Sequence, residues 1–309
     1  MIKKAQEAFD ILGPTPRFCI DFILRAGQLA AHQSHYQSEL SLLSLDQLKN
    51  IAREWSTLNA NTTARRHGSH AIFLIRREEV SPQHSQYLQL YTIEPITPLT
   101  SRTFTYLLTQ AEQRQRLDLY ETFSRVSHTR GLAGLVYEMI GHRRFQREVN
   151  LTLIPMAVDE QNTRRKNPVW QSQFFSPELD TIAFGFTPQN FKLYKWPGPE
   201  VVEPSTYYMP ESSNQLGFDS FIVVDRVLYT FQFTIGPKHP IKTGIADFLS
   251  HFQQSHQMTW EELRFVFVVP PGNKVECTQT REQEMEEFWN TVQLYSTVID
   301  PKEPEPEQE

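Results

Sequence analysis

The sequence has few cysteines and no long hydrophobic run, and both absences restrict what the protein can be. Its two cysteines, Cys19 and Cys277, lie far apart without metal-ligand or redox spacing, which indicates reduced, buried or incidental thiols in an intracellular protein. No apolar stretch approaches the length of a membrane span, so no membrane association is expected. Residues 1–10 lack the apolar run of a secretory signal, which favours an intracellular location, the nucleus included.

Two catalytic motifs and a strong positive charge are also missing. No Gly-x-x-x-x-Gly-Lys-Ser/Thr phosphate loop occurs, which excludes a self-contained P-loop ATPase, and there is no serine nucleophile elbow. The net charge is −6, and residues 301–309, with four Glu and one Lys, contribute half of it. A global field that attracts nucleic acid is therefore absent, so any nucleic-acid contact would depend on local basic patches.

What the chain has in quantity is aromatic residues, because its 309 residues include 21 Phe and 11 Tyr. This composition favours β-sheets with aromatic-rich faces, and the length allows one large domain or two ordinary ones. Residues 1–115 read as a mainly helical region. Residues 116–299 read as an α/β domain with a mixed central β-sheet flanked by helices, and residues 300–309 as a disordered acidic tail.

Hydrophobic periodicity predicts the individual elements. In the first region, a helix is expected after Arg17, a second within 41–55, and a strand within 71–75. In the second region, helices are expected over 131–143, around 245–252 and over 281–294. The expected strands are 148–158, 181–186, 191–194, a hairpin within 217–235, and 264–269.

The hairpin, Gly217–Ile235, is the most informative segment, because both its halves are rich in Val, Ile, Phe and Tyr. A turn centred on Asp225-Arg226 places Asp219 directly opposite Gln232, with Cβ atoms about 5 Å apart. Asp-Arg is not a favoured two-residue turn, but a longer symmetric loop on that centre keeps the pairing. Burying two oxygen-bearing side chains on an apolar sheet costs free energy unless they bind a ligand. A hydrated divalent cation is the natural candidate for that ligand.

Other residues are placed to complete such a site. Glu138 lies at the edge of the apolar stripe of the helix over 131–143, where its carboxylate can lean over the sheet as a third oxygen ligand. Mg²⁺ takes few protein oxygens and keeps several waters, so two carboxylates and an amide suffice. Lys238 and His239, just past the second strand, can stabilise phosphate charge or assist a water nucleophile. Each residue taken alone also fits an ordinary structural role, at a strand edge or on a solvated face.

Several short motifs resemble the restriction-endonuclease-like domain of Crinkler effectors, and the related retrotransposon hot spot proteins show a similar arrangement. The matching motifs are Gly134-Leu135-Val136-Tyr137-Glu138 with His142, Phe218-Asp219-Ser220, Phe231-Gln232-Phe233-Thr234, and His239-Pro240-Ile241-Lys242. The likeness spans roughly residues 130 to 270. The family belongs to the PD-(D/E)XK nuclease superfamily, whose core is a mixed sheet flanked by helices.

The resemblance implies a metal-dependent deoxyribonuclease, a hydrolase that acts on DNA. Asp219, Gln232 and Glu138 then bind Mg²⁺ or Mn²⁺. The superfamily motif has a lysine two residues after the second ligand, where this sequence has Thr234. Lys238 or Lys242 would then act as a migrated lysine. The resemblance thus implies Asp219, Gln232, Lys238 and Glu138 as catalytic residues, with His239 and Lys242 as phosphate contacts.

Two other interpretations stay open. Thr234 and the near-neutral charge favour a catalytically degenerate nuclease fold that acts as a DNA-binding or protein-interaction module. In addition, Gly13-Pro14-Thr15-Pro16-Arg17 resembles the segment that closes the AAA-like ATPase module of such proteins, with Arg17 as a nucleotide-sensing arginine. Because the phosphate loop is missing, a separate ATPase module is an implied partner, docked through residues 1–115.

Overall fold

The computed structural model describes residues 34, 36–56, 73–77, 91–95, 97–125, 129–158, 168–195, 197–211, 217–254, 260–279 and 285–304. The chain divides into two compact units, residues 1–139 and 140–309. The helix expected after Arg17 and the segment 13–17 lie outside the described residues. The domain boundary expected after residue 115 stays a prediction. None of the described helices is long and apolar enough to cross a membrane.

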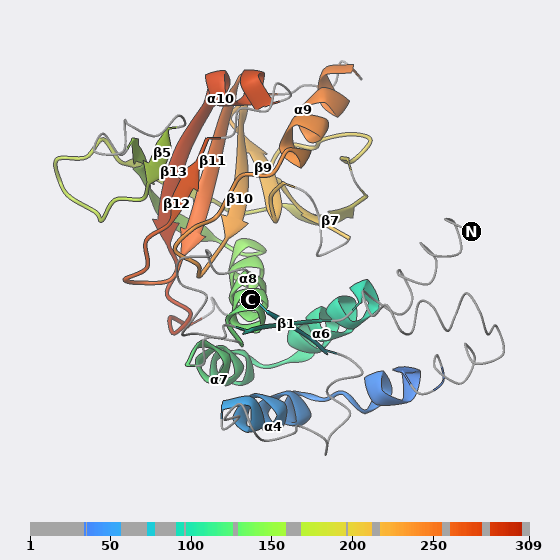
Figure 1. Cartoon of the computed structure of the whole chain (residues 1–309). Helices are drawn as coiled ribbons and strands as arrows, with labels where there is room; N and C mark the ends of the chain where they lie inside the picture. The colour runs from blue at the N-terminus through green and yellow to red at the C-terminus, as the bar shows by residue number, and fades with distance from the viewer. Residues whose placement is uncertain are drawn as a thin grey trace. The chain divides into compact units, whose positions relative to one another are not determined.

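The described part of the first unit consists of helices and one small sheet (Figure 1). Residues 36–42 are helical, and the longer helices are α4 (Leu45–Ser56), α6 (Pro98–Gln110), α7 (Gln113–Ser124) and the first part of α8 (Arg130–Phe145). Strand β1 (Phe73–Arg77) pairs antiparallel with β2 (Tyr91–Pro95). At the start of α6, Thr97 caps the helix by accepting a hydrogen bond from the N–H of Thr100, and Pro98 occupies the first turn. Most of the helix predicted within 41–55 is found as α4, and β1 overlaps the strand predicted within 71–75, of which residues 71 and 72 lie outside the described residues.

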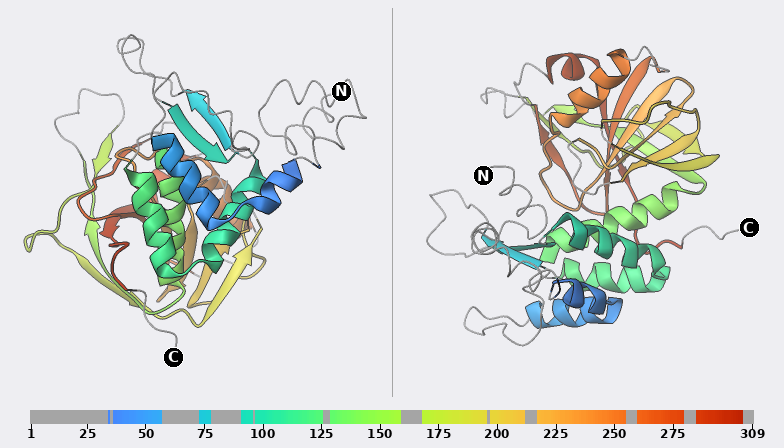
Figure 2. Two further views of the ribbon diagram at one scale, coloured as in Figure 1. Left: turned by 90° about the horizontal axis from the view of Figure 1, so that it is seen from below. Right: turned by 90° about the vertical axis from the view of Figure 1, so that its right-hand side faces the viewer.

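The second unit is built on an eight-stranded mixed sheet in the order β6-β3-β13-β11-β10-β9-β8-β7. The pairs β10–β11, β11–β13 and β7–β8 are parallel, and the remaining neighbours are antiparallel. The sheet is curled, as Figure 2 shows. Its strands are β3 (Val149–Pro155), β6 (Ile182–Phe186), β7 (Asn190–Tyr194), β8 (Thr206–Pro210), β9 (Ser220–Val224), β10 (Val227–Phe233), β11 (Glu262–Val269) and β13 (Val292–Val298). A smaller sheet joins β12 (Glu276–Thr278), β5 (Val169–Gln171) and β4 (Ala157–Val158).

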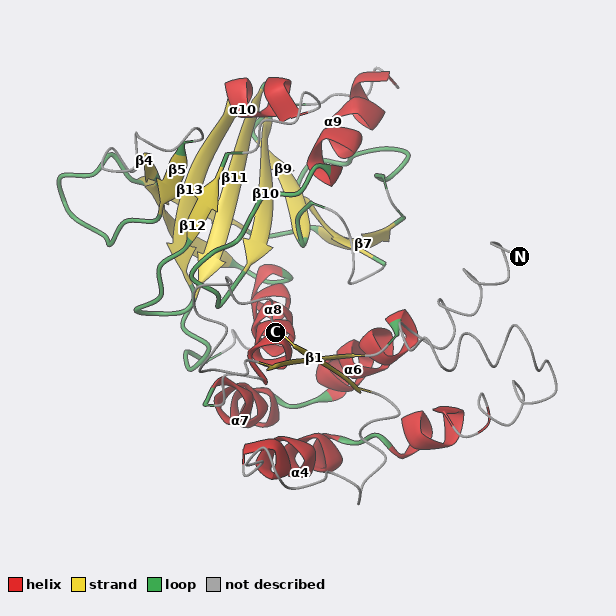
Figure 3. Ribbon diagram, in the orientation of Figure 1, coloured by secondary structure: helices red, strands yellow, loops and turns green. Residues whose placement is uncertain are grey.

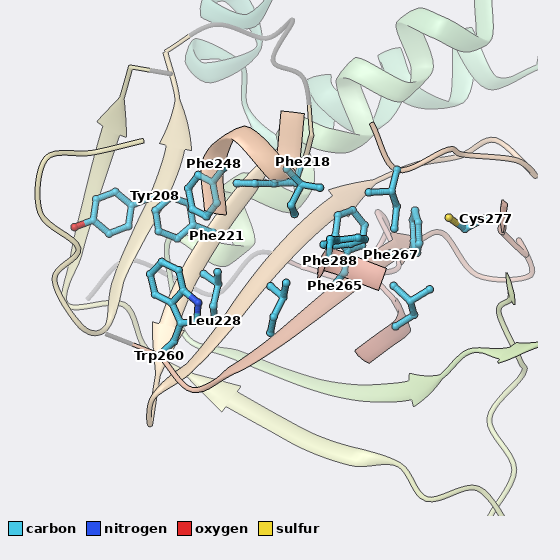
Figure 4. Packing of buried hydrophobic residues seen from close by; sticks show 14 of the residues in the cluster. Tyr208, Phe218, Phe221, Leu228, Phe248, Trp260, Phe265, Phe267, Cys277 and Phe288 are labelled. Carbon is cyan, nitrogen blue, oxygen red and sulfur yellow. The ribbon is translucent and has the colours of Figure 1, made fainter. Parts of the chain in front are cut away.

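Two helices cover one face of the large sheet (Figure 3). Helix α9 (Gly244–Gln254) connects β10 to the parallel strand β11, and α10 (Glu286–Thr291) precedes β13. Their apolar side chains share one buried cluster with inward-facing residues of the sheet (Figure 4). This cluster includes Tyr208, Phe218, Phe221, Leu228, Phe248, Phe252, Trp260, Phe265, Phe267 and Phe288.

The opposite face of the sheet carries the end of α8. Because side chains alternate along a strand, Phe231 and Phe233 of β10 point to the face opposite Gln232. The ring of Phe145 on α8 lies 4.7 Å from that of Phe231 and 5.3 Å from that of Phe233. A Cβ atom at Gly141 would overlap the ring of Phe233, so glycine allows the helix this close approach. The predicted fold class, an α/β domain with a mixed sheet flanked by helices, is confirmed.

The C-terminal part of the chain differs from the expected pattern. The helix predicted over 281–294 was wrong beyond residue 291, because residues 292–298 form β13 between β11 and β3. Residues 300–304 of the acidic tail are described, and Arg144 donates a hydrogen bond of 2.9 Å to the Glu303 carboxylate. The start of this tail is therefore tied to α8, while residues 305–309 lie outside the described part.

Candidate functional site at the open end of the β9–β10 hairpin

The turn between β9 and β10 contains only two residues. Asp225 has a φ of 49° and Arg226 a φ of 64°, the positive values that a type I′ turn requires at both central positions. The register pairs Val227 with Val224 and Phe231 with Ser220. The predicted turn centre is therefore confirmed, although the turn is the two-residue type that Asp-Arg does not favour.

Asp219 and Gln232 meet at the other end of this hairpin. The backbone N–H of Asp219 donates to the carbonyl oxygen of Phe231 over 2.8 Å, which extends the pairing past Ser220. The Gln232 Nε2 donates to Asp219 Oδ2 over 2.6 Å, and the N–H of Phe233 donates to the same oxygen over 2.7 Å. The predicted contact between the two side chains is confirmed, and two donors hold the carboxylate in one orientation.

These contacts define how the site can bind a cation. Because a carboxylate only accepts, Gln232 must turn its NH₂ group to Asp219, which leaves its Oε1 to face another donor or a cation. One carboxylate and one amide oxygen are hard ligands of the type Mg²⁺ prefers, and they suit an ion that keeps several waters. Within the described ranges, no three His, Cys, Asp or Glu side chains gather closely enough to hold a metal ion.

A buried hydrogen-bonded chain lies on the α8 face of the same hairpin. His142 Nδ1 and the Tyr207 hydroxyl are 2.7 Å apart, and this hydroxyl donates to Ser220 Oγ over 2.7 Å. Since the hydroxyl hydrogen points to Ser220, His142 Nδ1 donates to the tyrosine oxygen. Burial lowers the pKa of His142 to about 4, against the opposing effect of the Asp219 charge. The imidazole is therefore neutral at physiological pH, and the Tyr207 hydroxyl links it to Ser220, the residue that follows Asp219.

Glu138 lies on α8 within the first unit, one helical turn before His142. It is half-buried, and burial raises its pKa to about 7. A carboxyl group with such a pKa exchanges its proton near neutrality and ionises readily when a cation is supplied. Because Glu138 and Asp219 belong to different units, its membership of the site stays a prediction.

The basic residues that follow β10 lie in the described part of the chain. Lys238 is exposed, and its backbone forms a bridge with Glu276 at the edge of the small sheet. His239 is half-buried, and burial, reinforced by the Lys242 charge, lowers its pKa. Lys242 itself is exposed. Their catalytic and phosphate-binding roles stay predictions.

Thr234 has a local structural function. It is 7% exposed, and its Oγ1 accepts a hydrogen bond of 3.1 Å from the N–H of Gly236. Its own N–H donates to the carbonyl oxygen of Val268 over 3.0 Å. The position at which the resemblance leads one to expect a lysine therefore holds a threonine, whose side chain stabilises the turn that follows β10.

Sequence reasoning gave no role to three polar residues around the hairpin: Tyr194, Tyr207 and Ser220. Tyr207 and its neighbour Tyr208 are both buried, and nothing in their sequence context distinguishes them from residues that only pack. Tyr194 ends β7, and its ring centroid lies 5.4 Å from that of Phe221. No spacing signal connects Tyr194 or Tyr207 to Asp219, because both come from strands other than those of the hairpin.

Comparisons with protein-family models, with curated proteins and with solved structures found no match for this chain.

Proposed function

We propose that the protein is a metal-dependent deoxyribonuclease of the Crinkler type, with the catalytic site at Asp219. The observation that carries this proposal is the 2.6 Å contact between Gln232 and Asp219, which sets two oxygen-bearing side chains side by side. The mixed sheet with helices packed on its faces is the architecture expected for such a nuclease. An enzyme that acts on DNA would work where DNA is kept, so a nuclear location belongs to the proposal.

Asp219 and Gln232, joined by Glu138, would hold Mg²⁺ or Mn²⁺. When bound, the ion supplies water activation and neutralises the charge that develops on the phosphate during hydrolysis. The Asp219 carboxylate needs little reorganisation, because the amide of Gln232 and the N–H of Phe233 already orient it. Hydrolysis adds one water across a P–O bond and yields a phosphate monoester and a hydroxyl group.

The basic residues after β10 would serve the substrate. Lys238 and Lys242 are exposed, so their ammonium groups are accessible to a DNA backbone. Lys238 would assist the phosphate charge in place of the missing lysine, and His239 and Lys242 would contact phosphate oxygens. A separate ATPase module that docks through residues 1–115 is the protein partner of this proposal.

The test is cleavage of plasmid DNA by the purified protein with Mg²⁺, with Mn²⁺ and with EDTA. We expect cleavage with either metal, none with EDTA, and none with the Asp219→Ala variant. The matched control is Asp247→Ala, which removes an exposed carboxylate from α9 and should cleave normally. Unchanged cleavage by Asp219→Ala would sink the assignment.

A second candidate function is a DNA-binding module that has lost catalysis. The observation that favours it is the hydrogen bond from the N–H of Gly236 to Thr234 Oγ1. The residue at the expected lysine position then has a structural role and no catalytic one. In this case the wild type retards a DNA duplex in a gel without cutting it under any metal condition. The double substitution Lys238→Ala and Lys242→Ala should then weaken retardation and its salt dependence.

A further inference from the structure

A hydrogen-bonded chain of three buried polar side chains lies on the α8 face of the sheet. His142, Tyr207 and Ser220 are each at most 1% exposed, and they belong to α8, β8 and β9. Aromatic rings surround them, with the Tyr207 ring centroid 5.8 Å from that of Phe145 and 6.5 Å from that of Phe186. Apolar side chains of the same shape could fill this space at little cost, whereas a hydrogen-bonded chain also fixes the relative position of its three elements.

One end of this chain reaches the residue next to Asp219. The register of β8 and β9 pairs Tyr208 with Phe221. The Tyr207 hydroxyl donates to Ser220 Oγ over 2.7 Å, which adds a contact between the two strands one residue nearer to Asp219. Holding Ser220 therefore fixes the backbone from which the Asp219 side chain projects.

The other end of the chain reaches the donor that orients the Asp219 carboxylate. The His142 ring lies edge-on to the ring of Phe233, with the two centroids 4.9 Å apart. The N–H of Phe233 donates to Asp219 Oδ2 over 2.7 Å. Gly141 allows α8 this approach, because a Cβ atom there would overlap the Phe233 ring. His142 therefore restrains the donor residue, while its partner Tyr207 restrains the residue that follows the acceptor.

We propose that Tyr207, held by His142, is a positioning residue of the Asp219 site. The pair fixes Ser220 and Phe233, the two residues that set the place and the orientation of the Asp219 carboxylate. Because the pair is buried, it acts through these neighbours and does not touch the substrate. Its consequence for catalysis rests on the proposed nuclease function, in which a displacement of the carboxylate by about 1 Å can lower the rate about a hundredfold.

The first test needs neither metal nor DNA. Exchange of the Phe233 amide proton with deuterated solvent is followed by NMR in EDTA, in protein labelled with ¹⁵N-phenylalanine, and the signal is assigned through its loss in Phe233→Leu. Tyr207→Phe keeps the ring and removes both hydrogen bonds of the hydroxyl. The hydrogen bond from Phe233 to Asp219 should then open more often, and exchange should quicken about tenfold.

The matched control is the neighbouring variant Tyr208→Phe. It also removes the hydroxyl of a buried tyrosine in β8, but this hydroxyl is bonded to Glu203 and Val201. Tyr208→Phe should therefore leave exchange at Phe233 close to that of the wild type. Equal exchange rates at Phe233 in the two variants would overturn the positioning role.

Kinetics test the consequence for the reaction. Tyr207→Phe should lower kcat for DNA cleavage about tenfold with KM unchanged, because the substrate still binds while the carboxylate has lost its fixed orientation. Tyr208→Phe should cleave like the wild type. A purely structural role would leave kcat of the folded Tyr207→Phe protein unchanged, and that result would refute the proposal. Faster exchange at Phe233 in a protein that never cleaves DNA would keep the positioning of Asp219 and refute the nuclease function instead.

Discussion

The side-chain amide of Gln232 donates a 2.6 Å hydrogen bond to the carboxylate of Asp219, across the open end of the β9–β10 hairpin. The two residues lie 13 positions apart in the sequence: Asp219 directly precedes β9, and Gln232 lies in the antiparallel strand β10. Their contact links the register of the hairpin to the orientation of a carboxylate. The pair should therefore contribute both to stability and to any chemistry at Asp219.

Replacing Gln232 with leucine should destabilise the protein by about 1–3 kcal/mol, since the charged oxygen of Asp219 loses the amide donor of Gln232. The measurement is the midpoint of urea unfolding. The matched control is Gln253→Leu on α9, which removes an exposed hydrogen bond of 2.8 Å to Glu287 and should cost less than about 0.5 kcal/mol. Equal losses for both variants would show that the contact with Asp219 adds nothing.

Glu138 should make stability fall as pH rises toward neutrality. Burial raises its folded-state pKa from 4.5 to about 7, so the folded protein binds more protons than the unfolded chain between these values. The contribution of Glu138 to the free energy of unfolding is therefore fully present below pH 4.5 and is lost as the pH rises through 7. The free energy of unfolding changes by about 3 kcal/mol over this range.

The measurement is urea unfolding from pH 4.5 to 7.5 in EDTA. Glu138→Gln should remove the Glu138 contribution and be the more stable protein at pH 7.5. Glu286→Gln, at an exposed position on α10, should keep the wild-type profile. A Glu138→Gln profile parallel to that of the wild type would contradict the raised pKa.

Gly141→Ala should be destabilising although alanine is the better helix former. The added methyl group would overlap the ring of Phe233, which is itself packed against Phe145, and overpacking of this kind costs about 1–3 kcal/mol. Gly134 on the same helix has no described atom close to a new Cβ. Gly134→Ala should therefore stabilise by about 0.5–1 kcal/mol. Thermal unfolding of both variants checks the opposite signs.

Arg226→Gly should stabilise the hairpin. Arg226 holds a φ of 64°, which costs a residue with a side chain about 1 kcal/mol and costs glycine almost nothing. The substitution also removes the 2.7 Å ion pair with Glu261, but both partners are exposed and such pairs contribute little. Arg226→Ala removes the same ion pair and keeps the backbone strain, so it should lack the gain. Equal unfolding temperatures for the glycine and alanine variants would contradict the strain.

The hairpin and the contact between Asp219 and Gln232 were predictable because they depend only on residues that are close together in the sequence. Residues 217–235 combine β-rich halves around one centre, and antiparallel pairing then assigns every partner by symmetry. The strand β13 was not predictable in this way. Its apolar positions in 281–294 also suit a helix, and only its parallel pairing with β11 and its contact with β3 make it a strand.

The sequence by itself determined the α/β class, the hairpin and the meeting of Asp219 with Gln232. Periodicity and short-range pairing act over a few residues and need no knowledge of the rest of the chain. Tertiary structure alone decided that Tyr194 and Phe221 pack together and that His142, Tyr207 and Ser220 form one hydrogen-bonded chain. These residues come from separate strands and a helix, and only packing on the two faces of one sheet brings them within contact distance.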